Sequence, residues 1–480
     1  MVGSRPSPSA ERPPPILREF RGVWIASVGN INWPSRPDLT SGQQQQELIA
    51  LFDEAVRSHL NAVVLQIRPA GDALYESRIE PWSQYLTGIM GKAPVPFYDP
   101  LEFAVRQAHA RGLELHAWIN PYRASILPRK TPLAKNHLAI LHPEWVRTYG
   151  NHLWMDPGVS EVQSHVVSIV TDLITRYDLD GIHLDDYFYP YPEKTTSQTI
   201  LAFPDANTFS KYQSSGGKLG RSDWRRQNVN LLVERLYREV KRLKPEIRFG
   251  ISPFGIWRPG HPALIRGLDA YESIYADAKL WLNEGWVDYM SPQLYWGFEN
   301  QGQDFGALHQ WWLSQNKKHR HVWPGLNAVK VGQAWKADAI ARQILYTRQA
   351  GSDSGVILWN IGSLQRKTTQ LSDLLRDRTY LQPALPPDMS WVNTKPPPPP
   401  IAHLSKAEGT QWKIMWSSGT NQSPARWVFQ HRGGNVWTTE ILPAMNTSKM
   451  FPTKQQIPNA MALFAVSKAG HTSRATIVIP

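Results

Sequence analysis

The segment of residues 180–190, DGIHLDDYFYP, carries the side chains of this sequence best placed to do chemistry. It has the pattern of a strand in which alternation puts His183 and Asp185 on one face and Ile182 and Leu184 on the other. The apolar face is expected to pack against helices, so His183 and Asp185 should point into the mouth of a barrel. A carboxylate at such a strand end can stabilise or attack the cationic carbon formed during glycosidic bond cleavage.

Other roles are open to these carboxylates. Asp185 could instead cap a loop or pair with an arginine, although its place at the carboxyl end of a strand favours a functional role. Asp186 could serve as an acid/base partner or only orient its neighbour. We therefore predict Asp185 and Asp186 as the catalytic residues.

Polar and aromatic residues also gather at the ends of other predicted strands. Amide, hydroxyl and guanidinium groups can grip sugar hydroxyls, and aromatic rings can stack on sugar faces. Any one of them is readily explained as a satisfied interior group, but together they predict one binding face. The predicted substrate-binding residues are Arg68, Asp72, His116, Asn120, Tyr122, Arg123, His183, Tyr187, Gln293, Tyr295, Trp296 and Trp359.

A metal site is the alternative use of the same strand. His183 and Asp185 could bind a cation, but His116 is the only other strand histidine well placed to help. Strand one has no His-x-His pair of the kind that a metallohydrolase barrel would use. We therefore expect no metal, and no Gly-rich loop predicts another cofactor.

These residues must be positioned by alternating strands and helices, the pattern of repeated βα units. Predicted helices at 46–60, 160–177, 223–243 and 336–350 separate some of the strands, and Ser160 is expected to be an N-cap. Eight strands with helices between them favour a closed (β/α)8 barrel over an open doubly wound sheet. The predicted strands are Gly22–Val28, Ala62–Arg68, Leu113–Asn120, Gly181–Tyr187, Arg248–Pro253, Val287–Tyr295, His321–Ala328 and Gly355–Asn360.

The predicted domains are a disordered segment at 1–18, the barrel at 19–382, a linker at 383–401 and a β-sandwich at 402–480. The barrel exceeds the ~250 residues typical of the fold, so long loops are expected after strands three, four and five. The linker is Pro-rich, with the run Pro396–Pro400. Beyond it, short strand-like segments with turn residues between them predict an antiparallel sandwich.

Composition limits the class of protein. There is no cysteine, and no stretch approaches the ~18 apolar residues of a membrane span. The first fifteen residues lack the apolar core of a signal peptide. The net charge is +12, and residues 401–480 carry eight Lys/Arg against two Asp/Glu. This excess fits either solubility or attraction to anionic wall polymers, and no nucleic-acid motif accompanies it. The 21 Trp and 17 Tyr residues suit sugar binding as well as core packing.

The sequence resembles the glycosyl-hydrolase-like family ten, a group of bacterial glycosidases that includes peptidoglycan glycosidases. The matching segments span about 21–378, and the tail around 465–473 is similar to a fibronectin type III strand pair. The resemblance implies a glycosidase barrel with an Asp at the end of strand four, where Asp185 stands, and a cell-envelope or periplasmic location. The matching motifs include Arg21-Gly22-Val23-Trp24, Asn120-Pro121-Tyr122-Arg123, Asp156-Pro157-Gly158, Asp185-Asp186-Tyr187-Phe188-Tyr189 and Pro292-Gln293-Leu294-Tyr295-Trp296.

The proton donor is left open by the resemblance. Strand four is also similar to the Asp-Gly-x-Asp-x-Asp-x-Glu of chitinase-like barrels, but His183 and Tyr187 replace the second Asp and the Glu. Strand five ends without the Glu that serves as the acid in starch-active barrels. Candidate donors are Asp186, Asp72, Asp156, Asp277 and Glu299.

Two hypotheses follow from the sequence. The first is hydrolysis of a glycosidic bond in an amino-sugar polymer, with the peptidoglycan backbone as substrate, Asp185 at the anomeric carbon and Asp186 as acid/base. If the substrate's N-acetyl group is the nucleophile, Asp185 would orient it. The rival is a non-catalytic barrel that binds glycan and acts as a cell-envelope adaptor through its basic sandwich.

Overall fold

The computed structural model describes residues 12–480 except 130, 352 and 422. The chain divides into two compact units, and each is described here by itself. One is formed by residues 19–381, and the other by residues 382–480 with the N-terminal segment up to Arg18.

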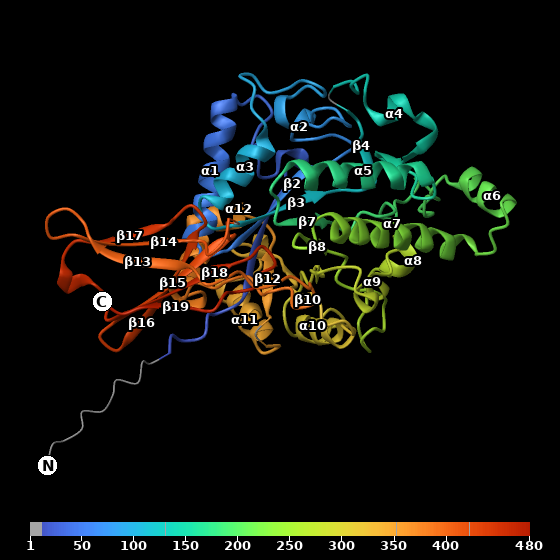
Figure 1. Ribbon diagram of the computed structural model, residues 1–480. Helices are drawn as coiled ribbons and strands as arrows, with labels where there is room; N and C mark the ends of the chain where they lie inside the picture. Colours follow the sequence, from blue (N-terminus) through green and yellow to red (C-terminus); the bar gives the residue numbers. More distant parts are fainter. Residues whose placement is uncertain (1–11, 130, 352, 422) are drawn as a thin grey trace, which may run out of the picture. The chain divides into compact units, whose positions relative to one another are not determined.

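The larger unit is built on a parallel sheet whose strands follow the order β10-β9-β8-β7-β3-β2-β1-β12-β11. All of its pairings are parallel, and helices connect most consecutive strands (Figure 1). The strands are β1 (Phe20–Ile25), β2 (Ala62–Arg68), β3 (Glu114–Ile119), β7 (Gly181–Leu184), β8 (Arg248–Ile251), β9 (Tyr289–Met290), β10 (His321–Val322), β11 (Gly325–Leu326) and β12 (Gly355–Leu358).

The sheet closes into a ring through β10 and β11. These two strands are separated only by Trp323 and Pro324, so they are two parts of one extended segment. β10 pairs with β9, and β11 pairs with β12. The N–H of Trp323 donates to Met290 O at 2.9 Å, and Pro324 O accepts from the N–H of Ile357 at 3.1 Å. The predicted closed (β/α)8 barrel is therefore confirmed, and the open doubly wound sheet is excluded.

Large side chains fill the inside of this ring. Phe20, Trp24, Trp118, Tyr289 and Trp323 form one buried cluster that is separate from the core between the strands and the helices. Inward-facing glycines make room for these rings. A Cβ atom on Gly250 would lie 2.0 Å from the Tyr289 ring. A Cβ atom on Gly181 would lie 2.6 Å from the His116 ring. The inside of the barrel is thus a packed core and not a pore.

Amphipathic helices cover the outside of the barrel. α1 begins with a capping box: the backbone N–H of Gln43 donates to Thr40 Oγ1, and the backbone N–H of Thr40 donates to the Gln43 side chain. The prediction that Ser160 caps α5 is wrong: Val159 is the N-cap and Ser160 is the first helical residue. The helices of this unit are α1 (Ser41–Arg57), α2 (Gln84–Thr87), α3 (Pro100–His109), α4 (Leu138–Leu141), α5 (Ser160–Arg176), α6 (Ala206–Ser214), α7 (Arg221–Leu243), α8 (Ala270–Ser273), α9 (Ala278–Glu284), α10 (Phe305–Ser314), α11 (Ala337–Arg348), α12 (Gly362–Gln365) and α13 (Leu371–Leu374).

The long segment after β3 folds into a small sheet of its own, which we call the insertion sheet. Its strands are β4 (Arg123–Ile126), β5 (Val146–Tyr149) and β6 (His152–Met155), in the antiparallel order β4-β6-β5. β5 and β6 form a tight hairpin in which Tyr149 pairs with His152. Because β4 begins just beyond the end of β3, this sheet rises directly from the carboxyl end of the barrel.

The smaller unit is a sandwich of two antiparallel sheets, as the turn-rich tail predicts. The sheets have the orders β13-β14-β17 and β16-β15-β18-β19. Ile414 and Trp416 of the first sheet pack against Trp427, Phe429 and Leu463 of the second. The strands are β13 (Ile401–Lys406), β14 (Trp412–Ser417), β15 (Arg426–Gly433), β16 (Val436–Pro443), β17 (Ser448–Phe451), β18 (Ala460–Val466) and β19 (Thr476–Val478).

Two segments expected to be disordered or a linker belong to this smaller unit. Residues 12–18 of the predicted disordered segment pack on it, with Arg18 bridging to Leu385; residues 1–11 lie outside the described residues. In the predicted linker, Leu385 and Met389 are buried. The proline content predicts a linker, but the apolar side chains between the prolines pack against the smaller unit and hold the segment in place. In the described part of the chain, no helix is long and apolar enough to cross a membrane.

Candidate active site

Asp185 lies directly after β7, at the carboxyl end of the barrel, and is 4% exposed. Its carboxylate accepts hydrogen bonds from Trp118 Nε1 at 3.0 Å and from Asn120 Nδ2 at 3.2 Å. The backbone N–H of Tyr187 donates to the other oxygen at 3.3 Å. Trp118 and Asn120 both reach this group because β3 pairs with β7 and alternate residues of β3 face inward. The strand pairing therefore fixes the carboxylate in place.

The electrostatic surroundings of Asp185 push its pKa in opposite directions. Burial, and then the charge of Asp186, raise the pKa of Asp185 to about 6. The guanidinium of Arg123 and the hydrogen bond from Trp118 act against this rise. Asp185 is consequently ionised at neutral pH but titrates in a range where an enzyme assay can follow it.

Asp186 is the second carboxyl of the site and is 6% exposed. Burial raises its pKa, while hydrogen bonds from the Tyr191 hydroxyl and the Gln293 side chain oppose that rise. Gln293 is itself held by a hydrogen bond from its Nε2 to Ser252 O at 3.0 Å. Because the charge of Asp186 disfavours the ionisation of Asp185, the two adjacent carboxyls suit one charged and one protonated role.

Arg123 supplies the positive charge nearest to the two carboxyls. It is 4% exposed, and its guanidinium lies 4.1 Å from the centre of the Tyr187 ring. The backbone N–H of Arg123 donates to Asn120 Oδ1 at 2.9 Å, which orients that amide so that its Nδ2 faces Asp185. The first residue of β4 thus contributes both a cation and a support for the carboxylate.

Behind the site, Arg68 holds Asn120 from the other side. Arg68 is fully buried, donates to Asn120 O, and forms a two-bond ion pair with Glu80 at 2.6 and 2.5 Å. His165 also contacts Glu80, at 2.9 Å. We predicted that Arg68 binds substrate, but the structure shows that its guanidinium is used in this chain of contacts and positions Asn120.

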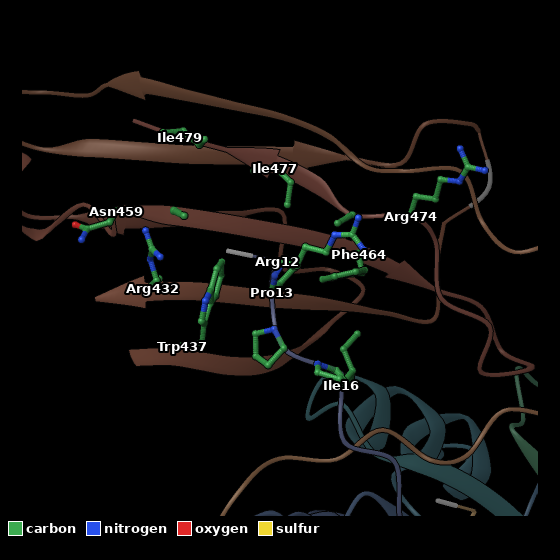
Figure 2. A pocket seen from close by; sticks show the side chains of 14 residues that line it. Arg12, Pro13, Ile16, Arg432, Trp437, Asn459, Phe464, Arg474, Ile477 and Ile479 are labelled. Atoms are coloured by element: carbon green, nitrogen blue, oxygen red, sulfur yellow. The ribbon is translucent and has the colours of Figure 1, made fainter. Parts of the chain in front are cut away.

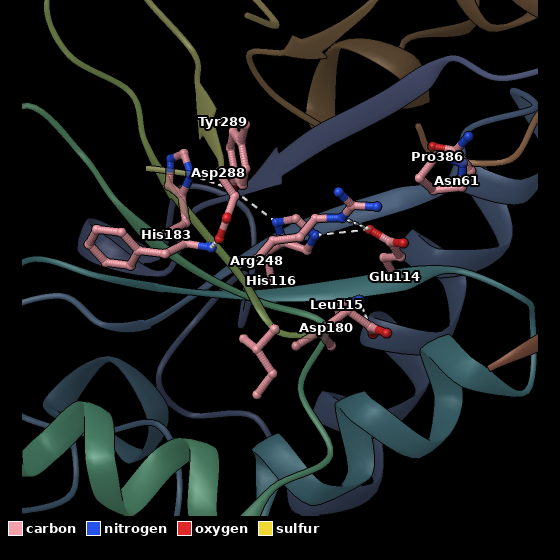
Figure 3. Close-up of polar contacts among 12 residues, drawn as sticks. Asn61, Glu114, Leu115, His116, Asp180, His183, Arg248, Asp288, Tyr289 and Pro386 are labelled. Carbon is pink, nitrogen blue, oxygen red and sulfur yellow. Dashed lines mark hydrogen bonds and ion pairs between the residues drawn. The ribbon is translucent and has the colours of Figure 1, made fainter. Parts of the chain in front are cut away.

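The two predicted substrate-binding histidines lie inside the barrel, and Figure 3 shows both of them beside Tyr289. Trp24 Nε1 donates to His183 Nε2 at 3.1 Å, so the His183 proton is on Nδ1 and donates to the Tyr289 hydroxyl at 2.9 Å. That hydroxyl can then donate to His116 Nδ1, also at 2.9 Å. His116 Nε2 is 3.2 Å from the Glu114 carboxylate, and this carboxylate forms an ion pair with Arg248 of β8.

This network keeps both rings from the solvent. His116 and His183 are 0% exposed, and burial holds the pKa of His183 well below its ordinary value. Fully buried rings whose nitrogens are engaged support the barrel interior and cannot reach a sugar. The sequence placed these side chains on the correct face of each strand but at the wrong depth.

The remaining predicted residues divide in the same way. The backbone N–H of Tyr187 contacts Asp185, and the Gln293 side chain contacts Asp186. Burial raises the pKa of Tyr295, and the charge of Asp186 raises it further. Trp359 lies 6.2 Å from the Trp118 ring. Trp296 joins the site through Phe254, which is 5.9 Å from it and 6.4 Å from Tyr191. Tyr122 and Asp72, by contrast, are fully buried.

Most of the other candidate proton donors have structural work. Asp156 pairs with Arg147 at 2.8 Å, and Asp277 caps α9 through the N–H of Leu280. Burial raises the pKa of Asp72 to about 7, but its oxygen accepts from the N–H of Ala70 and none of its contacts includes Asp185. Asp186 is the candidate that shares the site. Among the described residues, no group of three or more His, Asp or Glu side chains is arranged to hold a metal ion.

Two residues of the site escaped the sequence prediction. Trp118 stands two positions before Asn120, and the alternation of β3 would have placed it on the same inward face. Tyr191 lies in the loop after β7, and no periodic pattern reports where a loop side chain points.

A closed parallel barrel with paired carboxyls and an aromatic wall at its carboxyl end is the arrangement of a glycoside hydrolase. A sequence profile of the glycosyl hydrolase-like 10 family matches residues 19–341. The glycosyl hydrolase YngK of Bacillus subtilis (strain 168) is 38% identical over 402 residues, covering 81% of this chain and 77% of that protein. The glycosyl hydrolase DigH of Escherichia coli (strain K12) is 33% identical over 398 residues, covering 76% of this chain and 88% of that protein. The chain therefore belongs to the glycosyl hydrolase-like 10 family.

Solved structures were also compared with the fold. The PgaB glycoside hydrolase domain from Bordetella bronchiseptica aligns with a TM-score of 0.48 and 15% identity, over 75% of this chain and 99% of that one. The catalytic domain of a β-amylase from Paenibacillus polymyxa aligns with a TM-score of 0.46 and 9% identity, over 73% and 94%.

Proposed function

We propose that this protein hydrolyses glycosidic bonds in the amino-sugar backbone of bacterial peptidoglycan. The observation that carries the proposal is the buried Asp185 carboxylate, held by Trp118 and Asn120 beside a second buried carboxyl. Membership of a glycosyl hydrolase-like family supports the reaction class. The substrate and the cell-envelope location are our inference.

In this proposal the ionised Asp185 faces the anomeric carbon and stabilises or attacks it as the glycosidic bond breaks. Asp186 is the acid/base partner and gives a proton to the departing sugar oxygen, in the state of the pair in which Asp185 is charged and Asp186 is protonated. The Tyr191 hydroxyl stabilises the Asp186 carboxylate that remains. A water molecule then attacks the anomeric carbon and gives its proton back to Asp186, and any bond between that carbon and Asp185 breaks as the sugar is released. With a substrate whose N-acetyl oxygen attacks instead, Asp185 would orient and stabilise that group.

The sugar-binding wall would be formed by residues that the structure gathers around the two carboxyls. Tyr187, Tyr295, Trp296 and Trp359 offer ring faces, and Gln293 offers an amide. Arg123 adds a buried positive charge. A cation beside stacked rings suits an amino-sugar polymer that also carries carboxylates, as peptidoglycan strands do.

We also infer that the C-terminal unit has a fibronectin type III-like fold. Its sheet orders, with three and four strands, agree with a sandwich in which the chain crosses repeatedly between two antiparallel sheets.

The test is mass spectrometry of products from purified peptidoglycan strands with and without stem peptides, with chitin oligomers as a comparison. We expect shortened fragments from the wild type and none above background from Asp185→Asn. The exposed Asp338→Asn is the matched control and should retain full activity. Equal thermal unfolding of the two variants shows that folding is intact.

Two outcomes would count against the proposal. Full turnover by Asp185→Asn would remove this carboxyl from the reaction. Intact strands of every kind, together with measurable binding, would favour the non-catalytic glycan-binding barrel.

A further inference from the structure

The outer face of the sheet β16-β15-β18-β19 carries an unusual row of side chains. Trp427 and Phe429 of β15 point into the sandwich, so alternation turns Val428, Gln430 and Arg432 outward. In the register of the sheet, Arg432 stands opposite Trp437 of β16 and Ala460 of β18. The guanidinium of Arg432 lies 6.0 Å from the centre of the Trp437 ring. A flat ring, a cation and a small floor residue therefore lie in one line.

The N-terminal segment turns this face into a groove. Gln430 Nε2 donates to Pro14 O at 3.0 Å, which fixes the segment against the sheet. Together they enclose a groove of about 1190 Å³, large enough for several sugar rings. In Figure 2, Trp437 and Arg432 lie on one side of the segment, and Phe464 and Arg474 lie on the other.

The charges of the groove all have one sign. Arg12, Arg432 and Arg474 line it, and none of its described lining residues is acidic. Arg12 and Arg474 are exposed, and the apolar side chains of Ile477 and Ile479 are 47% and 67% exposed. Exposed apolar side chains contribute little to folding because they remain in contact with water. Together with three arginines they complement a partner that is anionic and has apolar faces.

We propose that this groove binds an acidic polysaccharide. The C–H face of a sugar ring would stack on Trp437, and the guanidinium groups would pair with carboxylates along the strand. Single-stranded nucleic acid usually binds through a series of aromatic platforms, whereas only Trp437 and Phe464 among the described lining residues are aromatic. The groove lies wholly within the smaller unit, so the proposal does not depend on catalysis by the barrel.

The experiment measures binding of the full-length protein to polygalacturonate by isothermal titration calorimetry. Its methyl ester, which has the same backbone without charge, serves as the comparison polymer. The double variant Arg432→Gln/Arg474→Gln should weaken binding about tenfold. This factor corresponds to the summed free energies of two partly exposed ion pairs. The matched variant Lys406→Gln/Lys454→Gln removes the same charge at exposed sites outside the groove and should bind as the wild type does.

Trp437→Phe provides a second, charge-neutral test. It retains a ring but reduces the stacking surface, so it should weaken binding while preserving the salt dependence of the interaction. Equal weakening by both charge variants would mean that net charge alone attracts the polymer, and would overturn the proposed site. Tighter binding to oligo(dT) than to polygalacturonate would assign the groove to nucleic acid instead. A dimer in light scattering that Arg432→Gln/Arg474→Gln abolishes would assign it to a second copy of the chain.

Discussion

The substitution Trp118→Phe tests the role of Asp185 while keeping an aromatic ring at this position. Phenylalanine retains an aromatic ring between the rings of His183 and Trp359, which lie 6.4 and 6.2 Å from Trp118. It removes the Nε1–H that donates to Asp185 at 3.0 Å, together with the second ring of the indole. That hydrogen bond favours the ionised form, so its loss must raise the pKa of Asp185 above its present value of about 6.

The size of the shift follows from the strength of the lost bond. A hydrogen bond to a charged group contributes roughly 1.5–3 kcal/mol, and one pKa unit corresponds to about 1.4 kcal/mol. Because Asn120 continues to donate to the carboxylate, we take the lower end and expect a rise of about one unit. At pH 6 the ionised fraction then falls about fivefold, whereas well above pH 8 it hardly changes.

The assay is the pH profile of kcat/KM on peptidoglycan strands, measured from the fragments released. If Asp185 reacts as a carboxylate, the acidic limb of the profile moves upward by about one pH unit. Trp359→Phe, which alters the same aromatic wall without touching Asp185, should leave that limb in place. An unmoved acidic limb in Trp118→Phe would refute the reasoning, and movement of the alkaline limb would mean that Asp185 acts as the acid.

Two further predictions concern stability, both measured by urea unfolding. Glu80→Gln should cost about 3–5 kcal/mol at neutral pH, because it leaves the buried Arg68 without its ion partner. The pKa of Glu80 is lowered to about 2, so the ionised carboxylate stabilises the fold fully above pH 4.5 and loses this effect as the pH falls towards 2. The difference in unfolding free energy between wild type and variant should therefore shrink below pH 4. Tyr289→Phe should cost about 1–3 kcal/mol for each histidine nitrogen left unpaired, those of His116 and His183, and an unchanged unfolding midpoint would contradict the proposed network.

The strands could be predicted because period-2 alternation and βα spacing are local properties of the sequence. Ala62–Arg68 was predicted to the residue. The strand predicted at 287–295 is only Tyr289–Met290 in the structure, although Gln293 continues the ladder through isolated bridges. Hydrophobic runs mark which segments are buried, but the ends of a strand depend on the neighbours that it pairs with.

The sequence predicted which residues face the inside of the barrel better than it predicted how deep in the barrel each one lies. Alternation put Asp185 and His183 on the inward face correctly, but two residues along a strand separate an open rim from a sealed interior. The insertion sheet was read as a loop because its strands are four residues each and mix polar with apolar side chains. Contacts such as that between Tyr191 and Asp186 depend on loop conformation, which no spacing encodes.

The insertion sheet places one charge of the candidate site outside the ring of barrel strands. Arg123 is the first residue of β4 and pairs with Trp154 of β6, so the cation beside the carboxyls moves with the insertion and not with the ring of strands. A substitution of the Arg123 side chain can therefore change the charge beside the carboxyls, while the backbone N–H of this residue still holds Asn120 and the barrel strands still hold the carboxyls. The charge of the candidate site and the frame that holds its carboxyls are thus separable parts of the fold.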